Sequence, residues 1–238
     1  MDMALLQKII GDVSKWSDPL TEIVPINYGE FFSNKDWEWI LDTCCKTKAQ
    51  IVIPTNGALL NEEKVSRLCS FPNVKVINFS VNAYFAETYE KFNALPFLTI
   101  SQIEEVIKVI KIERPDILVR VSMVFDPEYQ TDLEKDYFEA KWKGIAESWV
   151  LPAASCGRAK KPFTPVVAPC RSIFSDFVVG YDGKLSSCCF DAGFKLDLGY
   201  YSGDLKADWM NKKLTNLRKI HNEHNRVMVD LCEVCTFA

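Results

Sequence analysis

Hydrophobic residues in the first two-thirds of the chain follow two alternating patterns. Short runs rich in valine and isoleucine, typical of buried strands, alternate with longer stretches whose apolar residues recur every three to four positions, as in amphipathic helices. Strands are expected at residues 23–26, 51–53, 74–80, 117–124 and 148–151. Helices are expected at residues 3–16, from a cap at Asn34, from Asn61, at 103–112 and at 131–143.

This alternation predicts an α/β fold. Strands separated by helices of ten or more residues form parallel βαβ units with right-handed crossovers. In such sheets the chemistry lies at the carboxyl ends of the strands. Polar or glycine-containing segments stand at four of those ends, at residues 27–30, 55–57, 80–82 and 123–126. They are either ordinary turns or parts of one site.

The pattern changes after Leu151. A stretch rich in proline, glycine and basic residues leads to a predicted hairpin, whose arms at residues 174–179 and 184–187 flank a turn at Gly183. An amphipathic helix is expected at residues 207–225. His221 and His224 on this helix are expected to be exposed to solvent, and they could bind a metal only if they faced the cysteines.

Four cysteines carry the strongest chemical signal: Cys170, Cys188, Cys232 and Cys235. The last two form a Cys-x-x-Cys, in which a tight turn brings both sulfurs to one side, and the hairpin would bring Cys188 back toward them. Four thiolates suit either a tetrahedral Zn²⁺ or a [4Fe–4S] cluster. Cys189 follows Cys188 directly, and adjacent side chains on a strand point to opposite faces, so only one can join the site.

Composition narrows the class of protein. The chain has 238 residues, 48% of them hydrophobic, which indicates a folded protein with a sizeable core. A net charge of −4 argues against nucleic acid as a partner. No apolar run is long enough for a membrane span, and the N-terminal segment has no basic region, so a cytoplasmic protein is expected. Nine cysteines then indicate metal binding rather than disulfides; Cys44, Cys45 and Cys69, in helical patterns, are expected to be small buried residues.

Several strand-end segments resemble the radical S-adenosylmethionine (SAM) superfamily. Asn27-Tyr28-Gly29-Glu30 is similar to the Gly-Glu segment that receives the methionine amino group of SAM. Thr55-Asn56-Gly57 and Phe79-Ser80-Val81-Asn82 are similar to two further cofactor segments. The resemblance implies a set of residues in contact with SAM: Gly29, Glu30, Thr55, Ser80, Asn82, Arg120 and Met123. It identifies no catalytic residue.

The C-terminal part resembles the SPASM or twitch domain, which follows the barrel in part of this superfamily. Twelve residues separate Cys170 from Gly183 and four separate Gly183 from Cys188, as in the opening of that domain. Gly157-Arg158, Leu198-Gly199 and Asp208-Trp209 are further landmarks of the resemblance. It implies that one auxiliary [4Fe–4S] cluster is held by four thiolates: Cys170, Cys188, Cys232 and Cys235. The same count selects Cys188 over Cys189.

The resemblance implies two domains. Residues 1–158 would form a partial (β/α)6 TIM-like barrel that lacks its first strand, and residues 159–238 a small α+β SPASM or twitch domain. The second strand of the family barrel, at residues 23–26, would then be an exposed apolar edge, which favours self-association or pairing with another chain.

One departure separates this chain from the family. The Cys-x-x-x-Cys-x-x-Cys motif that binds the catalytic cluster is absent. We therefore expect no cleavage of SAM by this chain alone. It would be an N-terminally truncated protein, a split enzyme whose first strand and cluster loop lie on a second chain, or a degenerate relative.

Two functions follow from these patterns. With the motif supplied, the chain would belong to a radical SAM oxidoreductase or maturase that oxidises or modifies a peptide or a small molecule. The competing hypothesis is a non-enzymatic binding module that is stabilised by Zn²⁺ bound to the same four thiolates.

Overall fold

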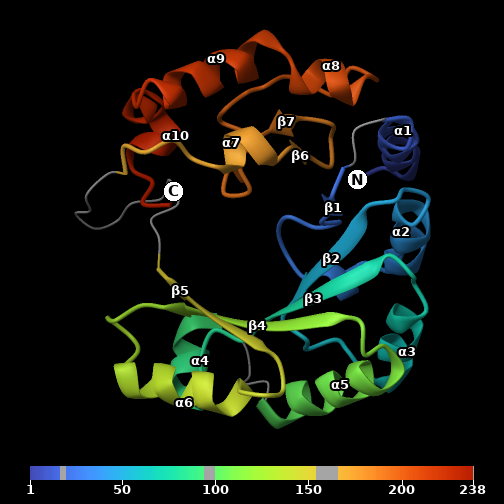
Figure 1. Cartoon of the computed structure of the whole chain (residues 1–238), viewed down its shortest axis with the longest axis vertical. Helices are drawn as coiled ribbons and strands as arrows, with labels where there is room; N and C mark the ends of the chain where they lie inside the picture. The colour runs from blue at the N-terminus through green and yellow to red at the C-terminus, as the bar shows by residue number, and fades with distance from the viewer. Residues whose placement is uncertain (17–19, 94–99, 154–165, 238) are drawn as a thin grey trace. The chain divides into compact units, whose positions relative to one another are not determined.

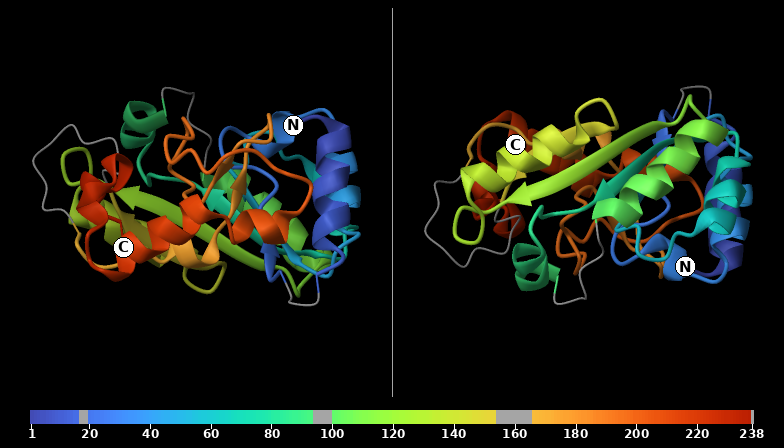
Figure 2. Two further views of the ribbon diagram at one scale, coloured as in Figure 1. Left: turned by 90° about the horizontal axis from the view of Figure 1, so that it is seen from above. Right: turned by 90° about the horizontal axis from the view of Figure 1, so that it is seen from below.

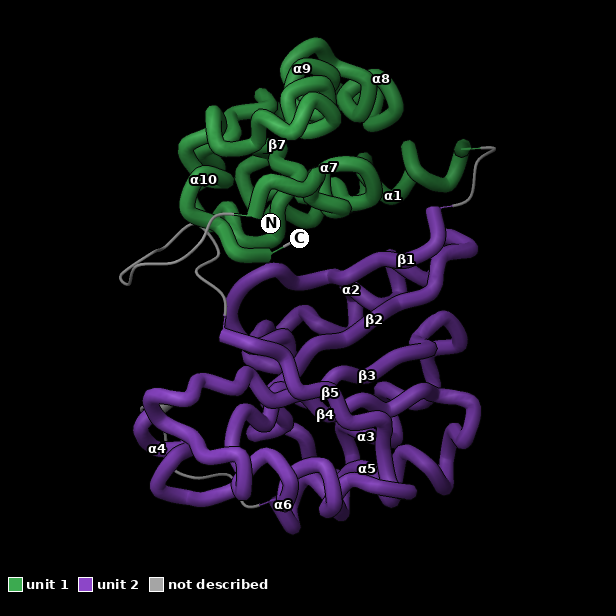
Figure 3. The backbone as a smooth tube through the Cα atoms, turned by 60° about the vertical axis from the view of Figure 1, so that its left-hand side comes forward, with its two compact units in different colours: residues 1–16, 154–238 green, residues 17–153 purple. Residues whose placement is uncertain are grey.

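The computed structural model describes residues 1–16, 20–93, 100–153 and 166–237. The chain forms two compact units (Figure 3). We call residues 17–153 the sheet unit, and residues 1–16 together with 154–238 the cysteine unit.

The first helix, α1 (Met3–Val13), belongs to the cysteine unit, which differs from the expected division into residues 1–158 and 159–238. The backbone N–H of Leu205 donates a hydrogen bond to the carboxylate of Asp12. The Tyr201 hydroxyl lies 3.4 Å from the Lys8 carbonyl oxygen. The periodicity of residues 3–16 predicted this helix but contains nothing that selects its packing partner.

The sheet unit contains five parallel strands in sequence order (Figure 1). Their bounds are β1 (Glu22–Ile23), β2 (Gln50–Thr55), β3 (Val74–Ser80), β4 (Leu118–Phe125) and β5 (Glu147–Pro152). The predicted α/β class is confirmed. Among the described strands, β1 pairs only with β2 and only over two residues, so it is the short edge at which a preceding strand would pair.

Helices cover one face of this sheet, as the views in Figures 1 and 2 show. They are α2 (Trp37–Cys44), α3 (Glu62–Cys69), α4 (Ala86–Asn93), α5 (Ile100–Glu113) and α6 (Asp132–Trp142), with a 3-10 turn η1 (Phe31–Ser33). Asn61 caps α3 as predicted, because its Oδ1 accepts the Lys64 N–H at 2.9 Å. Asn34 does not cap α2, which begins at Trp37, and α4 was not predicted. No helix in the described ranges has both the length and the apolar content needed to cross a membrane.

The pleat of the sheet separates an apolar face from a polar one. On β4 the side chains of Val119, Val121 and Met123 are at most 1% exposed. Arg120 and Ser122 alternate with them and are partly exposed. Since alternate residues share a face, the buried set packs under the helices and the polar set lies on the opposite face. Each buried side chain of this size contributes about 1.5–3 kcal/mol.

The cysteine unit consists of short elements. They are α7 (Ser172–Ser175), β6 (Val178–Val179), β7 (Leu185–Ser186), α8 (Leu205–Trp209), α9 (Lys212–Asn222), a 3-10 turn η2 (Arg226–Met228) and α10 (Asp230–Glu233). Strands β6 and β7 pair antiparallel, so the predicted hairpin is present. Its first arm is shorter than predicted, because Phe174 lies in α7. The single helix predicted at 207–225 is two helices.

The break between α8 and α9 has a local cause. Helix α8 ends at Trp209, and Asn211 caps α9, because its Oδ1 accepts the Leu214 N–H at 2.9 Å. Among the described residues of this unit, one cluster of buried apolar side chains consists of Ile173, Leu185, Leu198, Leu214 and Leu217.

Candidate metal centre and strand-end site

The four cysteines singled out in the sequence line one cavity of the cysteine unit. Cys170 precedes α7, Cys188 follows β7, Cys232 lies in α10 and Cys235 follows α10. Segments that are distant in the sequence therefore converge on one point. Cys189 is exposed and does not line the cavity, so the geometry favours Cys188 of the adjacent pair.

A buried carboxylate shapes the loop that carries Cys188. Asp191 is only 2% exposed and accepts hydrogen bonds from the Ser186 hydroxyl at 2.9 Å and from the backbone N–H groups of Lys195 and Leu196 at 2.7 and 3.1 Å. The Ser186 oxygen in turn accepts the Cys188 N–H at 3.4 Å. These bonds direct the chain after β7 back toward the cavity.

His221 is fully buried beside the cavity, so the expected solvent exposure was wrong for this residue. Its Nδ1 accepts the backbone N–H of Cys170 at 3.2 Å, which leaves the proton of a neutral imidazole on Nε2. That Nε2 has no hydrogen-bond partner in the part of the chain that the structure describes. His224, two positions beyond the end of α9, is exposed as expected.

Two further buried donors without partners line the same cavity. Arg226 is 1% exposed, and its two terminal nitrogens donate to the carbonyl oxygens of Ala168 and Phe237 at 3.1 and 2.8 Å. Its Nε and the hydroxyl of Ser187 have no partner among the described residues. Unpaired buried donors are uncommon in native proteins and point to an acceptor beyond the described part of the chain.

Burial raises the pKa of the Cys188 thiol to about 12 and that of Cys232 to about 11. The other cysteines of the cavity add to the rise, while the positive charge of Arg226 opposes it at Cys232. Without a bound cation these thiols are neutral at physiological pH. A metal or cluster would therefore displace protons from them on binding.

The cavity is small as it stands. Its volume is about 20 Å³, which is space for one or two water molecules. Within the described ranges, no three side chains of His, Cys, Asp or Glu lie at the spacing needed to hold a metal ion. Loading would therefore require the cysteine-bearing segments to rearrange. The chemistry of the lining fits an iron–sulfur cluster, because four thiols can bind iron and the three unpaired donors match the acceptor sulfurs.

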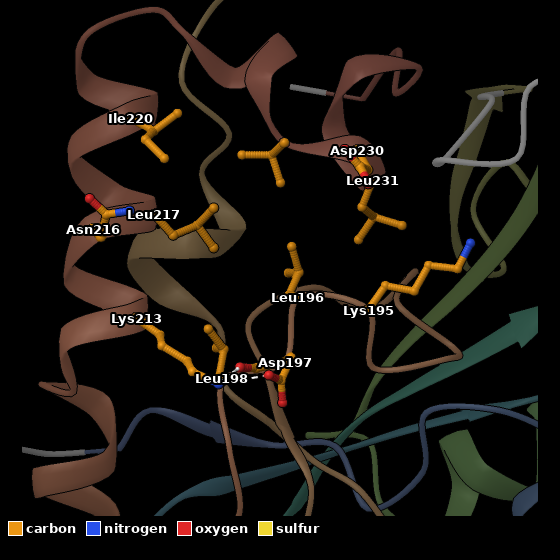
Figure 4. Close-up of a pocket in the computed structure, with 11 residues that line it drawn as sticks. Lys195, Leu196, Asp197, Leu198, Lys213, Asn216, Leu217, Ile220, Asp230 and Leu231 are labelled. Atoms are coloured by element: carbon orange, nitrogen blue, oxygen red, sulfur yellow. Dashed lines mark hydrogen bonds and ion pairs between the residues drawn. The ribbon is translucent and has the colours of Figure 1, made fainter.

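A wider groove of about 690 Å³ lies against this cavity (Figure 4). Leu196, Leu217 and Leu231 line both spaces and form the wall between them. Lys213 and Asp197 lie at the rim of the groove, 2.7 Å apart at their charged atoms. The leucine wall limits the access of water to the cavity from this side, and water access is one of the controls on the potential of a metal site.

In the sheet unit, Glu30 and Thr55 meet at the end of β2. The Glu30 carboxylate accepts the Thr55 hydroxyl at 2.7 Å and the Asn56 N–H at 2.8 Å. Thr55 Oγ1 also accepts the Gly57 N–H at 2.9 Å. Gly29 precedes Glu30 with a φ of 91°, a backbone conformation that favours glycine. The structure thus brings together three of the residues expected to contact SAM.

Ser80 and Arg120 share the polar face of the sheet. Ser80 lies opposite Ser122 on β4, and Asn78 lies opposite Arg120. The Arg120 Nε is 2.7 Å from a carboxylate oxygen of Glu147, and the guanidinium carbon lies 4.4 Å from the Trp149 ring centroid. Arg120 is therefore already engaged by two neighbours.

Asn82 and Met123 occupy different environments. Asn82 has a φ of 63°, and its Oδ1 accepts the Val124 N–H at 3.3 Å, which fixes the turn after β3. Met123 is fully buried on the face of β4 opposite to Arg120. Arg120 and Met123 thus lie on opposite faces, and the structure does not bring them together.

Sequence reasoning expected His221 to be exposed, and it missed Arg226 and Ser187, which no pattern in the sequence distinguishes. It also missed Asn78, a neighbour of Arg120 whose buried Oδ1 lacks a partner. The sequence did contain a signal for Asn78, because this amide lies between the apolar residues Ile77 and Phe79 in the middle of β3. Gly157-Arg158 lies outside the described residues.

Comparisons with known proteins bear on two features: the segment that contains the four cysteines and the fold of the chain. Residues 170–236 match the family model of SPASM, an iron–sulfur cluster-binding domain. The fold is similar to that of BtrN in complex with AdoMet and 2-DOIA: TM-score 0.66, 18% identity, over 99% of this chain and 80% of BtrN. No curated protein matches the sequence.

Two further structures are similar. Native anSMEcpe with bound AdoMet and the Cp18Cys peptide has a TM-score of 0.69 and 16% identity, over 98% of this chain and 80% of that chain. Streptococcus suis SuiB has a TM-score of 0.60 and 13% identity, over 92% of this chain and 62% of SuiB. The predicted resemblance is confirmed in two respects: residues 170–236 match the SPASM model, and the fold is similar to that of structures solved with bound AdoMet.

Proposed function

We propose that this chain is an iron–sulfur protein of the radical SAM/SPASM type whose Cys170, Cys188, Cys232 and Cys235 hold one auxiliary [4Fe–4S] cluster. The observation that carries the proposal is the cavity of the cysteine unit, which is lined by these four thiols and by three buried donors without partners. The cavity lies within the segment that matches the SPASM domain.

The residues around the cavity have distinct roles in this proposal. The four thiolates bind the irons, Asp191 holds the loop that carries Cys188, and the leucine wall limits water on one side. When bound, the cluster would supply one-electron chemistry, with a potential set by hydrogen bonds and burial.

The strand-end residues support a SAM site in the sheet unit. Glu30 accepts bonds from Phe32 and Thr55 at Oε1 and from Asn56 at Oε2, so Oε2 keeps a lone pair that could accept a methionine ammonium group. Gly29, Ser80, Asn82 and Arg120 are the other candidate contacts there, and Met123 would act through packing. SAM cleavage requires the absent cysteine triplet, so a second chain or further sequence would have to supply it. Binding by this chain alone should be weak, because chelation of the methionine group by the iron of that cluster is missing.

The proposed reaction is oxidation or modification of a peptide or a small molecule in the cytoplasm. Both substrate classes occur with similar structures, since anSMEcpe was solved with a peptide and BtrN with 2-DOIA. Calorimetry with SAM, followed by a search for 5′-deoxyadenosine under dithionite, tests the sheet unit. Cleavage by this chain alone would contradict the proposed dependence on an additional cluster motif.

A zinc-stabilised binding module is the second candidate, because four thiolates also form a tetrahedral zinc site. Purification without oxygen, followed by iron, sulfide and zinc analysis of the whole chain, separates the two. We expect about four irons and four sulfides for each chain. Colourless protein with one zinc ion would overturn the iron–sulfur proposal.

A further inference from the structure

The histidine at the cavity carries an unused donor in a fixed orientation. His221 is fully buried, lines the cavity with the four cysteines, and accepts the Cys170 N–H at Nδ1. That bond defines both the ring orientation and the tautomer, because an accepting Nδ1 places the proton on Nε2. The buried Nε2–H has no acceptor in the described part of the chain. An unpaired buried donor of this kind lowers the stability of the fold unless a bound group accepts its hydrogen bond.

Arg226 presents a second unused donor together with a buried charge. Its terminal nitrogens are bonded to Ala168, two residues before Cys170, and to Phe237, two residues after Cys235. Each terminal nitrogen thus uses one of its hydrogens, whereas Nε–H has no partner among the described residues. None of the ion pairs among the described residues includes this guanidinium. A buried cation requires a compensating anion, and a cluster with four thiolates is one.

We propose that His221 Nε2–H and Arg226 Nε–H donate hydrogen bonds to sulfur atoms of the bound cluster and thereby raise its reduction potential. This inference rests on the proposed function. Reduction by one electron adds a negative charge to an already anionic group, and no proton moves. Donors and a cation at short range in a low-dielectric site stabilise the reduced form more than the oxidised form. Both residues are positioning residues for the cluster rather than catalytic residues.

Two substitutions at one position separate the donor from the structural bond. In His221→Asn, the side-chain oxygen can reproduce the Nδ1 acceptor for Cys170, but nothing replaces Nε2–H. In His221→Gln, the longer amide places an N–H near the position of Nε2, but it no longer offers an acceptor to the backbone N–H of Cys170. We expect His221→Asn to keep its iron and to shift the reduction equilibrium about tenfold toward the oxidised form, which lowers the one-electron potential by about 59 mV. His221→Gln should recover most of that potential.

The measurements are iron and sulfide content, a mediated redox titration, and the electron paramagnetic resonance spectrum of the reduced protein. Arg226→Gln, which removes the charge, should lower the potential more than Arg226→Lys. His224→Asn is the matched control, because His224 is exposed and its φ of 58° is a conformation that asparagine accepts. Its potential should equal that of the unmodified chain.

The outcomes decide the inference separately from the proposed function. Zinc or no iron in the unmodified chain would refute the proposed function. Iron-loaded His221→Asn and Arg226→Gln proteins with unchanged potentials would refute only the tuning role. Loss of iron in His221→Asn but not in His221→Gln supports the donor. Loss in both variants would instead assign His221 to the support of Cys170 and overturn the inference.

Discussion

The sheet unit and the cysteine unit are stabilised in different ways. The sheet unit has strands of six to eight residues from β2 to β5, and a continuous core in which Ile51, Ile53 and Ile77 are completely buried. The cysteine unit has two-residue strands and short helices, and three buried donors at its cavity have no partner among the described residues. The first unit is stabilised mainly by its own apolar core. The second has the composition of a small domain that depends on a bound metal group.

The largest expected effect follows from removal of one ligand. Cys188→Ser should lose the cluster and most of the stability of the cysteine unit, because binding energy in small metal domains is folding energy, about 10–16 kcal/mol for structural zinc sites. Hydrogen exchange should become fast throughout the cysteine unit and remain slow in β2, β3 and β4. Cys189→Ser is the control and should keep most of its iron. The reverse pattern would show that the hairpin register is off by one residue.

The next effect concerns the core of the sheet unit. Phe138 is completely buried in α6, so Phe138→Ala should lower the free energy of unfolding by about 3–5 kcal/mol. Leu133→Ala on the same helix, at a side chain that is 57% exposed, should change it by less than about 0.5 kcal/mol. Iron content should be unaffected by both. Iron loss in Phe138→Ala equal to that of Cys188→Ser would contradict the independence of the two units.

A smaller effect depends on pH in the metal-free protein. Burial, with a contribution from the charge of Arg226, lowers the pKa of His221 from 6.5 to about 4. The folded state therefore resists protonation, so the neutral ring contributes stability above pH 6.5 that is lost as the pH falls toward 4. The loss should be about 2–4 kcal/mol in the cysteine unit. Denaturant unfolding across this range measures it, and a curve for His221→Asn with the same slope would refute it.

The smallest effect lies at the strand-end site. Thr55→Val removes the hydroxyl that donates to Glu30 and accepts the Gly57 N–H, and it should lower the stability of the sheet unit by about 1–2 kcal/mol. Thr55→Ser keeps the hydroxyl and should recover most of the loss. Equal stability of the two variants would show that the Glu30 contact adds nothing to the fold.

Much of the sheet unit could be predicted from the sequence, because each parallel strand is a local run of apolar residues. The strand at 74–80 was predicted with the same bounds as β3. The break at Asn211 was missed, because the apolar period continues across it. Arg120 and Met123 were assigned to one ligand, although an odd spacing on a strand places them on opposite faces.

In the cysteine unit, the sequence predicted the cysteines of the candidate metal site but not the other buried residues around them. Their spacing identified the ligands, whereas His221 and Arg226 owe their burial to tertiary contacts with Cys170, Ala168 and Phe237. Such contacts leave no period in the sequence. An exposed histidine and a buried one look alike on a helix whose neighbours are charged.

The position of α1 has a consequence for synthesis on the ribosome. Asp12 cannot form its hydrogen bond until Leu205, which lies 193 residues later in the chain, has been synthesised. At about 5–20 residues per second, the interval is about 10–40 s. During it the whole sheet unit emerges and can fold, while α1 remains without the residues it finally packs against. The apolar face of α1 therefore stays uncovered by its own unit for that time, and the cysteine unit is completed after the sheet unit although α1 is synthesised before it.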